Sequence, residues 1–301
     1  MRKESFPSQV YIGELESGSK RVRPPQRLIN DEAVEWATAW TADSKAVLFT
    51  SDRGGKWGVL KQAIAENTAQ PLIQGRESAN LVRLGPDGSW VLYSENSLAR
   101  DGRSRHYRLM QLALTGGPPR LVYETTEAEL QDYSCARSPA SRCVAIELDH
   151  NETRLTVTAL DPVKGKGELL RTVETAPGTG FAWALSPDGS MLAMAKGNEP
   201  EIRIRLLSLT GSVDQEIAVK GWPSIASMDW APDGEGLYCG SVTSQSGTLL
   251  YVDRRGFMQV VARSREIGGG AFIAGVPSPN GRYLAFPGAY SYSNAWLIEA
   301  F

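Results

Sequence analysis

The stretch WALSPDGSMLAMA, residues 183–195, has the pattern of a strand, a tight turn and a second strand. The ring of Pro187 fixes φ near the value that the second position of a type I turn requires. Gly189 can adopt the left-handed conformation that closes a bulged hairpin. Beyond the turn, Leu192 and Met194 stand two residues apart and therefore point to the same face of a strand. The stretch predicts a β-hairpin with a buried face.

This hairpin pattern recurs along the whole chain. Its six turns are residues 41–44, 85–88, 138–141, 186–189, 231–234 and 278–281. Five positions after the proline or its equivalent, every copy has an aliphatic residue, namely Val47, Val91, Val144, Leu192, Leu237 and Leu284. The repeat has a period of about 47 residues, which is within the range of β-propeller blades.

A third strand and a short outer strand follow each hairpin. The third strands are predicted at 57–64, 107–114, 154–160, 202–209, 248–253 and 294–300. The outer strands are predicted at 71–74, 119–123, 169–173, 215–219 and 258–262, and Gln26–Ile29 supplies the sixth. We therefore predict an all-β fold, a six-bladed β-propeller of four-stranded antiparallel blades closed by an N-terminal strand, which leaves few exposed sheet edges.

The propeller is expected to form one domain over residues 9–301, after a disordered tail at 1–8. Its blades are predicted at 33–75, 79–124, 127–174, 178–220, 223–263 and 268–301 with 26–30. Gln9–Leu15 also reads as a third strand, but Asn294–Ala300 already fills that position in the last blade. We interpret Gln9–Leu15 as a surplus strand, a relic of an earlier blade, with an added edge strand next to Gln26–Ile29 as the alternative.

The repeated turns resemble the WD-like repeats of TolB-type propellers. The runs AWTADSKAVLFTSDRGGKWGVLKQAI (39–64) and VKGWPSIASMDWAPDGEGLY (219–238) resemble the C-terminal propeller that acidobacterial winged-helix regulators and membrane-anchored Ser/Thr kinases carry. This resemblance spans essentially the whole chain. It implies a sensing or docking domain, and it carries over no catalytic residue.

Composition excludes several classes of function. The 32 basic and 34 acidic side chains give a net charge of −2, which argues against general nucleic-acid binding. No run approaches the roughly 18 apolar residues of a membrane span, so no membrane insertion is expected. The first 20 residues lack the apolar core of a secretory signal. We expect a monomer that is periplasmic if it derives from a membrane-anchored parent, and cytoplasmic otherwise.

Two of the three cysteines flank the third turn. If this turn closes like the others, Cys135 faces Ala145 and Cys143 faces Arg137, which leaves the two sulfurs as diagonal neighbours. We therefore expect two buried thiols, with a disulfide as the alternative. Cys239 fits a simple core role or a reduced compartment.

No catalytic or metal-binding motif is found in the sequence. It has no G-x-S-x-G nucleophile elbow, and its two histidines, His106 and His150, lack a second ligand at a usual zinc spacing. The glycine-rich stretch 267–270 is followed by no phosphate-binding Lys-Ser/Thr pair. We predict no catalytic residue, no metal and no cofactor.

Aromatic residues give the best indication of a binding site. The connections from each outer strand to the next inner strand lie on one face around a propeller channel. They hold Glu35-Trp36, Asn80, Arg83, Asp132-Tyr133, Phe181, Trp222 and Phe272. We predict binding by Trp36, Arg83, Tyr133, Phe181, Trp222 and Phe272, although packing inside the fold is an equal alternative for Trp36, Tyr133 and Trp222. Trp40, Trp183 and Trp230, next to the turns, are expected to pack between blades.

These observations favour a non-catalytic binding, sensing or scaffold module that recognises a protein or a small ligand on one propeller face. The alternative is a propeller-type glycoside hydrolase or lyase that uses carboxylates around the channel. Two or three carboxylates within about 5–10 Å of one another at the channel mouth would favour this alternative.

Overall fold

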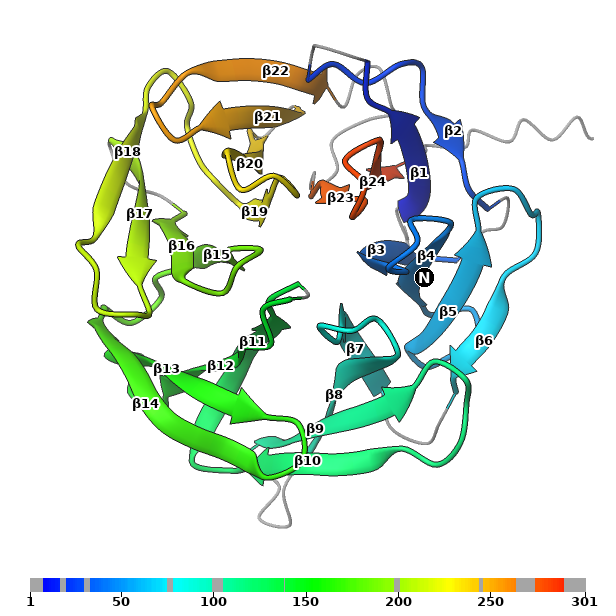
Figure 1. Cartoon of the computed structure of the whole chain (residues 1–301), viewed down its shortest axis with the longest axis horizontal. Coiled ribbons are helices and arrows are strands. Elements are labelled where there is room, and N and C mark those ends of the chain that lie inside the picture. The colour runs from blue at the N-terminus through cyan, green and yellow to red at the C-terminus, as the bar shows by residue number, and fades with distance from the viewer. Residues whose placement is uncertain are drawn as a thin grey trace, which may run out of the picture.

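The chain forms a ring of six four-stranded antiparallel sheets around a central channel (Figure 1). This computed structural model describes residues 8–16, 20–29, 33–74, 78–98, 105–137, 139–197, 201–243, 246–263 and 274–289. Every regular element in these ranges is a strand. The predicted six-bladed, all-β propeller is confirmed.

Each blade has one inner strand beside the channel and three strands outside it. The inner strands of blades one to six are β3 (Glu35–Trp40), β7 (Ser78–Leu84), β11 (Ala128–Cys135), β15 (Phe181–Leu185), β19 (Ser227–Trp230) and β23 (Val276–Pro277). The second strands are β4 (Ala46–Ser51), β8 (Trp90–Leu98), β12 (Cys143–Asp149), β16 (Met191–Lys196), β20 (Gly236–Val242) and β24 (Tyr283–Ala289). The third strands are β5 (Gly58–Ala63), β9 (Arg105–Ala113), β13 (Arg154–Asp161), β17 (Ile202–Ser208), β21 (Gly247–Asp253) and β1 (Ser8–Glu14). The outer strands are β6 (Gln70–Ile73), β10 (Arg120–Thr125), β14 (Gly165–Glu174), β18 (Gln215–Val219), β22 (Met258–Arg263) and β2 (Gln26–Arg27).

The N-terminal segment closes the ring with two strands instead of one. β1 pairs with β24 along its whole length, from Ser8 opposite Ala289 to Glu14 opposite Tyr283, and β2 is the outer strand beside β1. The interpretation of residues 9–15 as a surplus strand is therefore wrong, because this segment occupies the third position of blade six. The predicted third strand at 294–300 lies outside the described residues.

The repeated turns adopt the predicted conformation in most blades. Gly189 and Gly281 have φ values of 71° and 69°, which confirms the left-handed closing position. Ser44 takes this position in blade one with φ 60°. Its buried hydroxyl accepts a hydrogen bond from the backbone N–H of Asn280 in the neighbouring blade, at 3.1 Å. This contact connects the turns of blades one and six, where the ring closes.

Blade three has a wider hairpin than the other five blades. In blade four, the backbone N–H of Ser186 donates to the carbonyl of Met191, and the other four blades repeat this bond at their own turns. In blade three, the backbone N–H of Ala136 donates instead to the carbonyl of Arg142, at 2.7 Å. This shift places Cys135 directly opposite Cys143, and the two form a disulfide. The expectation of two thiols is therefore wrong, whereas Cys239 is a free, buried cysteine in blade five.

The hydrophobic core lies between neighbouring blades. Trp40 and Trp230 are almost fully buried, as predicted. Each donates its indole N–H to a carbonyl in the inner strand of the preceding blade, at Val276 and Ala184 respectively. These bonds satisfy the indole groups, and they fix each inner strand against its neighbour at the wall of the channel.

Candidate functional site

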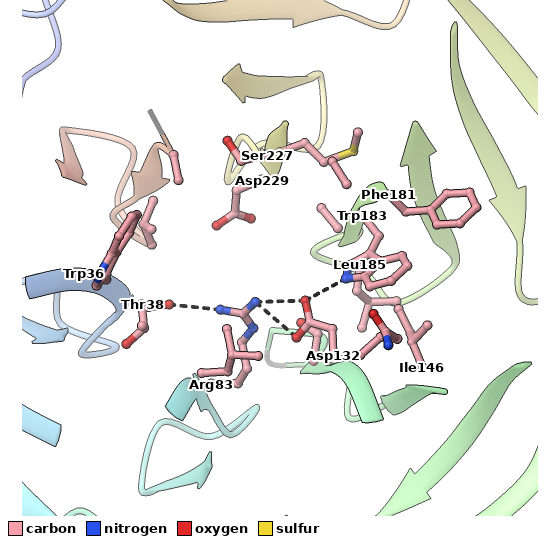
Figure 2. Close-up of a pocket in the computed structure, with 18 of the residues that line it drawn as sticks. Trp36, Thr38, Arg83, Asp132, Ile146, Phe181, Trp183, Leu185, Ser227 and Asp229 are labelled. Carbon is pink, nitrogen blue, oxygen red and sulfur yellow. Dashed lines mark hydrogen bonds and ion pairs between the residues drawn. The ribbon is translucent and has the colours of Figure 1, made fainter. Parts of the chain in front are cut away.

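A cavity of about 610 Å³ opens on the face of the ring where the inner strands begin. We call it the aromatic cavity because its walls include Trp36, Trp57, Phe181 and Trp183. Phe181 and Trp183 stack on each other, with ring centroids 6.0 Å apart, and Figure 2 shows Trp36 on the opposite side of the opening. The inner strands β3, β11, β15 and β19 all contribute to this lining, so the cavity depends on the closed ring.

An ion pair between blades two and three lies at the bottom of the aromatic cavity. Nη2 of Arg83 donates to both carboxylate oxygens of Asp132, at 3.1 and 3.0 Å. Nε and Nη1 of Arg83 donate to the carbonyls of Tyr133 and Thr38 at 3.3 and 3.4 Å, so the guanidinium contacts blades one and three. Burial lowers the pKa of Arg83, but the Asp132 carboxylate outweighs this effect and raises it above its ordinary value.

Asp132 also accepts hydrogen bonds from blades three and four. Its Oδ1 accepts the backbone N–H of Tyr133 at 2.7 Å, and its Oδ2 accepts the indole N–H of Trp183 at 3.0 Å (Figure 2). Both oxygens are therefore used within the protein. Trp183 was expected to pack between blades like Trp40 and Trp230, and it does pack against the hydrophobic cluster of blades three and four, but it also lines the aromatic cavity. It stands three residues before its turn, whereas the other two directly precede theirs, and so it reaches the channel opening.

Asp229 is a second carboxylate in the aromatic cavity. It extends from β19, and Figure 2 shows its carboxylate pointing into the channel towards Arg83. Within the described part of the chain, Asp229 forms no ion pair. Burial raises the pKa of Asp229. The charges of Arg137 and Arg83 lower this pKa by attraction, and the Asp132 carboxylate raises it further. The net result is a pKa above the ordinary value.

A second cavity, of about 620 Å³, opens on the opposite face of the ring. We call it the turn-side cavity because the turns of all six blades line it, at Ala42, Pro86, Pro139, Pro187, Pro232 and Pro279. Arg83 and Asp229 line both cavities, which places them where the two meet. Of these two cavities, Arg137 lines the turn-side cavity alone, and its buried Nη1 has no hydrogen-bond partner among the described residues. The channel thus has one face rich in aromatic residues and one rich in proline.

Comparisons with known proteins identify the fold. No protein-family model and no curated protein sequence matches the chain. The structure of a putative TolB from Agrobacterium tumefaciens matches with a TM-score of 0.69 and 16% identity, over 96% of this chain and 100% of the other. TolB from Acinetobacter baumannii matches with a TM-score of 0.58 and 13% identity, over 94% of this chain and 65% of the other. The chain therefore has a TolB-like β-propeller fold.

The same fold occurs in a protein that is named as an enzyme. An oligogalacturonate lyase from Vibrio parahaemolyticus matches the TolB-like propeller with a TM-score of 0.51 and 11% identity, over 94% of this chain and 98% of the other. At such identities, these similarities concern the fold alone. The resemblance to acidobacterial regulators and kinases stays a prediction.

The TolB-like propeller brings three of the six predicted binding residues together. Trp36, Arg83 and Phe181 line the aromatic cavity. Tyr133 is fully buried and donates its hydroxyl to the carbonyl of Leu81, so its side chain belongs to the core. Trp222 is half-buried against the hydrophobic cluster of blades four and five. Phe272 lies outside the described residues.

Three cavity residues were missing from the sequence prediction. Trp57 lies in the connection between the second and third strands of blade one. In each blade, this connection lies on the same face of the ring as the connection from an outer strand to the next inner strand. Trp183 and Asp229 lie inside inner strands, which were treated as core. A charged residue in an otherwise apolar inner strand could have revealed Asp229, because alternate side chains of such a strand point into the channel.

Proposed function

We propose that this TolB-like propeller is a non-catalytic binding module that takes a protein segment or a small ligand into the aromatic cavity. The observation that carries this proposal is the combination of aromatic walls with a few fixed polar groups in one concave site. Stacked rings such as Phe181 and Trp183 present apolar surface that is already ordered. The protein therefore loses little conformational entropy when a ligand binds. A volume of about 610 Å³ suits a drug-sized ligand or one or two side chains.

The hydrogen bonds of Asp132 support binding over catalysis for this residue. A general acid or base must be free to exchange a proton with the substrate. Asp132 is instead bonded to Arg83, to Trp183 and to the backbone, so its oxygens serve to hold three blades together. Within the described part of the chain, no group of three or more His, Cys, Asp or Glu side chains could hold a metal ion.

We place the protein in an oxidising compartment such as the periplasm. The disulfide between Cys135 and Cys143 supports this placement, because such bonds persist where thiols are not kept reduced. No helix in the described ranges is long and apolar enough to cross a membrane.

A selection with a phage-displayed random heptapeptide library tests the binding proposal. Phe181→Ala removes a wall of the aromatic cavity, whereas Phe257→Ala removes an exposed ring from the turn between β21 and β22 and serves as the matched control. Enriched peptides should bind wild-type protein and Phe257→Ala equally, and should bind Phe181→Ala at least about tenfold more weakly. A library that yields no binder, or binders that tolerate Phe181→Ala and Trp36→Ala, would contradict the proposal.

A carbohydrate-active enzyme is the second candidate, because Asp132 and Asp229 are two carboxylates in one cavity lined by indole rings. The assay is turnover of polygalacturonate and of a panel of nitrophenyl glycosides by purified protein. If the protein is a binding module, wild-type protein should show no turnover above that of the Asp229→Asn variant. Turnover that this variant abolishes would establish the enzyme instead.

A further inference from the structure

The charges in the aromatic cavity do not balance. Of the described residues that line it, three are charged, namely Arg83, Asp132 and Asp229. The first two form an ion pair through Nη2 of Arg83 and neutralise each other. The carboxyl group of Asp229 remains without an ion-pair partner among the described residues that line this cavity.

Arg83 is held away from Asp229 by its other contacts. Each nitrogen of its guanidinium donates to a protein acceptor, namely the carbonyls of Thr38 and Tyr133 and the carboxylate of Asp132. Turning towards Asp229 would break these bonds to blades one and three. Arg83 therefore attracts Asp229 by its charge but forms no ion pair with it.

Arg137, on the turn side of the channel, does not form an ion pair with Asp229 either. It lines the turn-side cavity and is absent from the lining of the aromatic cavity. Its backbone N–H donates to the carbonyl of Pro187 at 2.8 Å, which fixes its position in the hairpin of blade three. It too attracts Asp229 by charge, without an ion pair in the described structure. A ligand that enters through the aromatic opening would therefore meet the carboxylate of Asp229 without Arg137 in the same cavity.

The aromatic rings around the carboxylate of Asp229 are suited to a cationic ligand. In the view of Figure 2, the carboxylate points into the space between Trp36 and Trp183. The indole N–H of Trp183 donates to Asp132, and its ring stacks on Phe181, so the two rings line the cavity together. The electron-rich faces of indole and phenyl rings attract cations, most strongly where water is excluded.

We infer that the aromatic cavity selects a ligand whose inserted group is a cation with N–H donors, a primary ammonium, amidinium or guanidinium, that binds to Asp229. This inference rests on the proposed binding function and specifies the class of ligand. The carboxylate accepts charge-assisted hydrogen bonds, which quaternary ammonium groups cannot donate. The aromatic rings surround the apolar stem of the ligand. The side chain of lysine or arginine has this form.

Three probes of similar shape test the inference in wild-type protein. Benzamidinium has the charge and the donors, benzamide has donors without the charge, and benzyltrimethylammonium has the charge without donors. Binding is measured by saturation-transfer NMR and calorimetry at up to millimolar concentrations. Benzamidinium should bind at least about tenfold more tightly than either of the other two probes.

Asp229→Asn should reduce the binding of benzamidinium about tenfold or more and leave that of benzamide unchanged. Glu168→Gln, an exposed change on the outer strand β14, is the control and should change neither. A melting curve shows that Asp229→Asn is folded, and the comparison of probes in wild-type protein needs no variant. Equal binding of benzamidinium and benzamide, both lost in Phe181→Ala, would overturn this inference and leave the proposed function standing. If no probe binds and the heptapeptide selection also yields no binder, both this inference and the proposed function are wrong.

Discussion

At the scale of single residues, Asp229 combines a role in binding with a cost in stability. Its side chain is half-buried in the channel near Asp132, and attraction by Arg137 and Arg83 does not offset the lost solvation and the repulsion, so its pKa lies above the ordinary value of 3.8. The folded protein therefore binds a proton at Asp229 more readily than the unfolded chain does. The group destabilises the fold progressively as pH rises from 3.8 through the raised pKa.

Asp229→Asn should therefore melt at a higher temperature than wild-type protein at pH 7. The advantage should shrink as pH falls through the raised pKa and disappear below 3.8, because Asp229 is then protonated in both the folded and the unfolded protein. Calorimetry at a series of pH values measures the difference. Glu168→Gln, an exposed change on β14, is the control for a general change in charge. A variant that is less stable than wild type at pH 7 would show that the carboxylate is compensated in the fold.

Two glycines at equivalent turn positions should differ in their tolerance of a side chain. Both have positive φ, so alanine should cost about 1 kcal/mol at either position. A Cβ at Gly189 would also come within 2.9 Å of Cβ of Ala136 and 3.1 Å of Cβ of Arg142, whereas at Gly281 the nearest atom, Cγ of Pro232, is 3.9 Å away. Gly189→Ala should therefore lower the free energy of unfolding more than Gly281→Ala. Urea unfolding of both variants checks this order, and equal losses would contradict it.

At the scale of elements, the disulfide stabilises a hairpin that departs from the repeat. It links residues eight apart in sequence, and the loop-entropy model gives on the order of 2–3 kcal/mol for such a closure. Cys143→Ser should lower the free energy of unfolding by about this amount. Alkylation of unfolded, unreduced protein followed by mass spectrometry should modify only Cys239. Modification of Cys135 and Cys143 without reduction would show that the bridge is absent.

The closing strands of blade six provide a second test at this scale. β1 buries Val10 and Tyr11 and pairs fully with β24, and Gln9 accepts two hydrogen bonds from Arg27 on β2. Burial of Val10 and Tyr11 contributes about 1.5–3 kcal/mol each, and the backbone hydrogen bonds add about 1 kcal/mol each. The sum is comparable with the stability of a typical domain.

Deletion of residues 1–15 should therefore lower the melting temperature strongly and cause aggregation through the exposed edge of β24. Deletion of residues 1–7, which leaves β1 intact, should have neither effect. Thermal unfolding with simultaneous light scattering measures both. If the two deletions melt alike, the N-terminal segment does not close the ring.

At the scale of the whole molecule, the sequence predicts the ring better than its closure. The turn signals are local, because a proline and a glycine at fixed positions specify a hairpin in any blade, and six copies at one period specify six blades. Which terminal segment pairs with β24 depends on long-range contacts. Gln9–Leu15 and Asn294–Ala300 both have the pattern of a third strand, and no local feature decides between them. The register of blade three was missed for a related reason, since its turn differs from the other five.

The sequence predicts only those residues of the candidate site that stand in or next to the connections between strands. Trp36 and Phe181 stand near the start of inner strands and appeared as aromatic residues on one face. Tyr133 stands five residues before its turn, as Trp36 and Phe181 do, but the hairpin of blade three is wider and the side chain of Tyr133 points into the core. Asp229 depends on the convergence of several blades on the channel, which sequence alone does not display.

The central claim is that a ligand enters the channel through the aromatic opening. Photo-crosslinking tests it most directly, with a selected heptapeptide that carries p-benzoylphenylalanine and with mapping of the linked residues by mass spectrometry. We predict that crosslinks fall on Trp36, Phe181 and Trp183, and that excess unlabelled peptide abolishes them. Crosslinks confined to the turn-side residues Pro187 and Pro232, or to the outer rim at Phe257, would contradict the account.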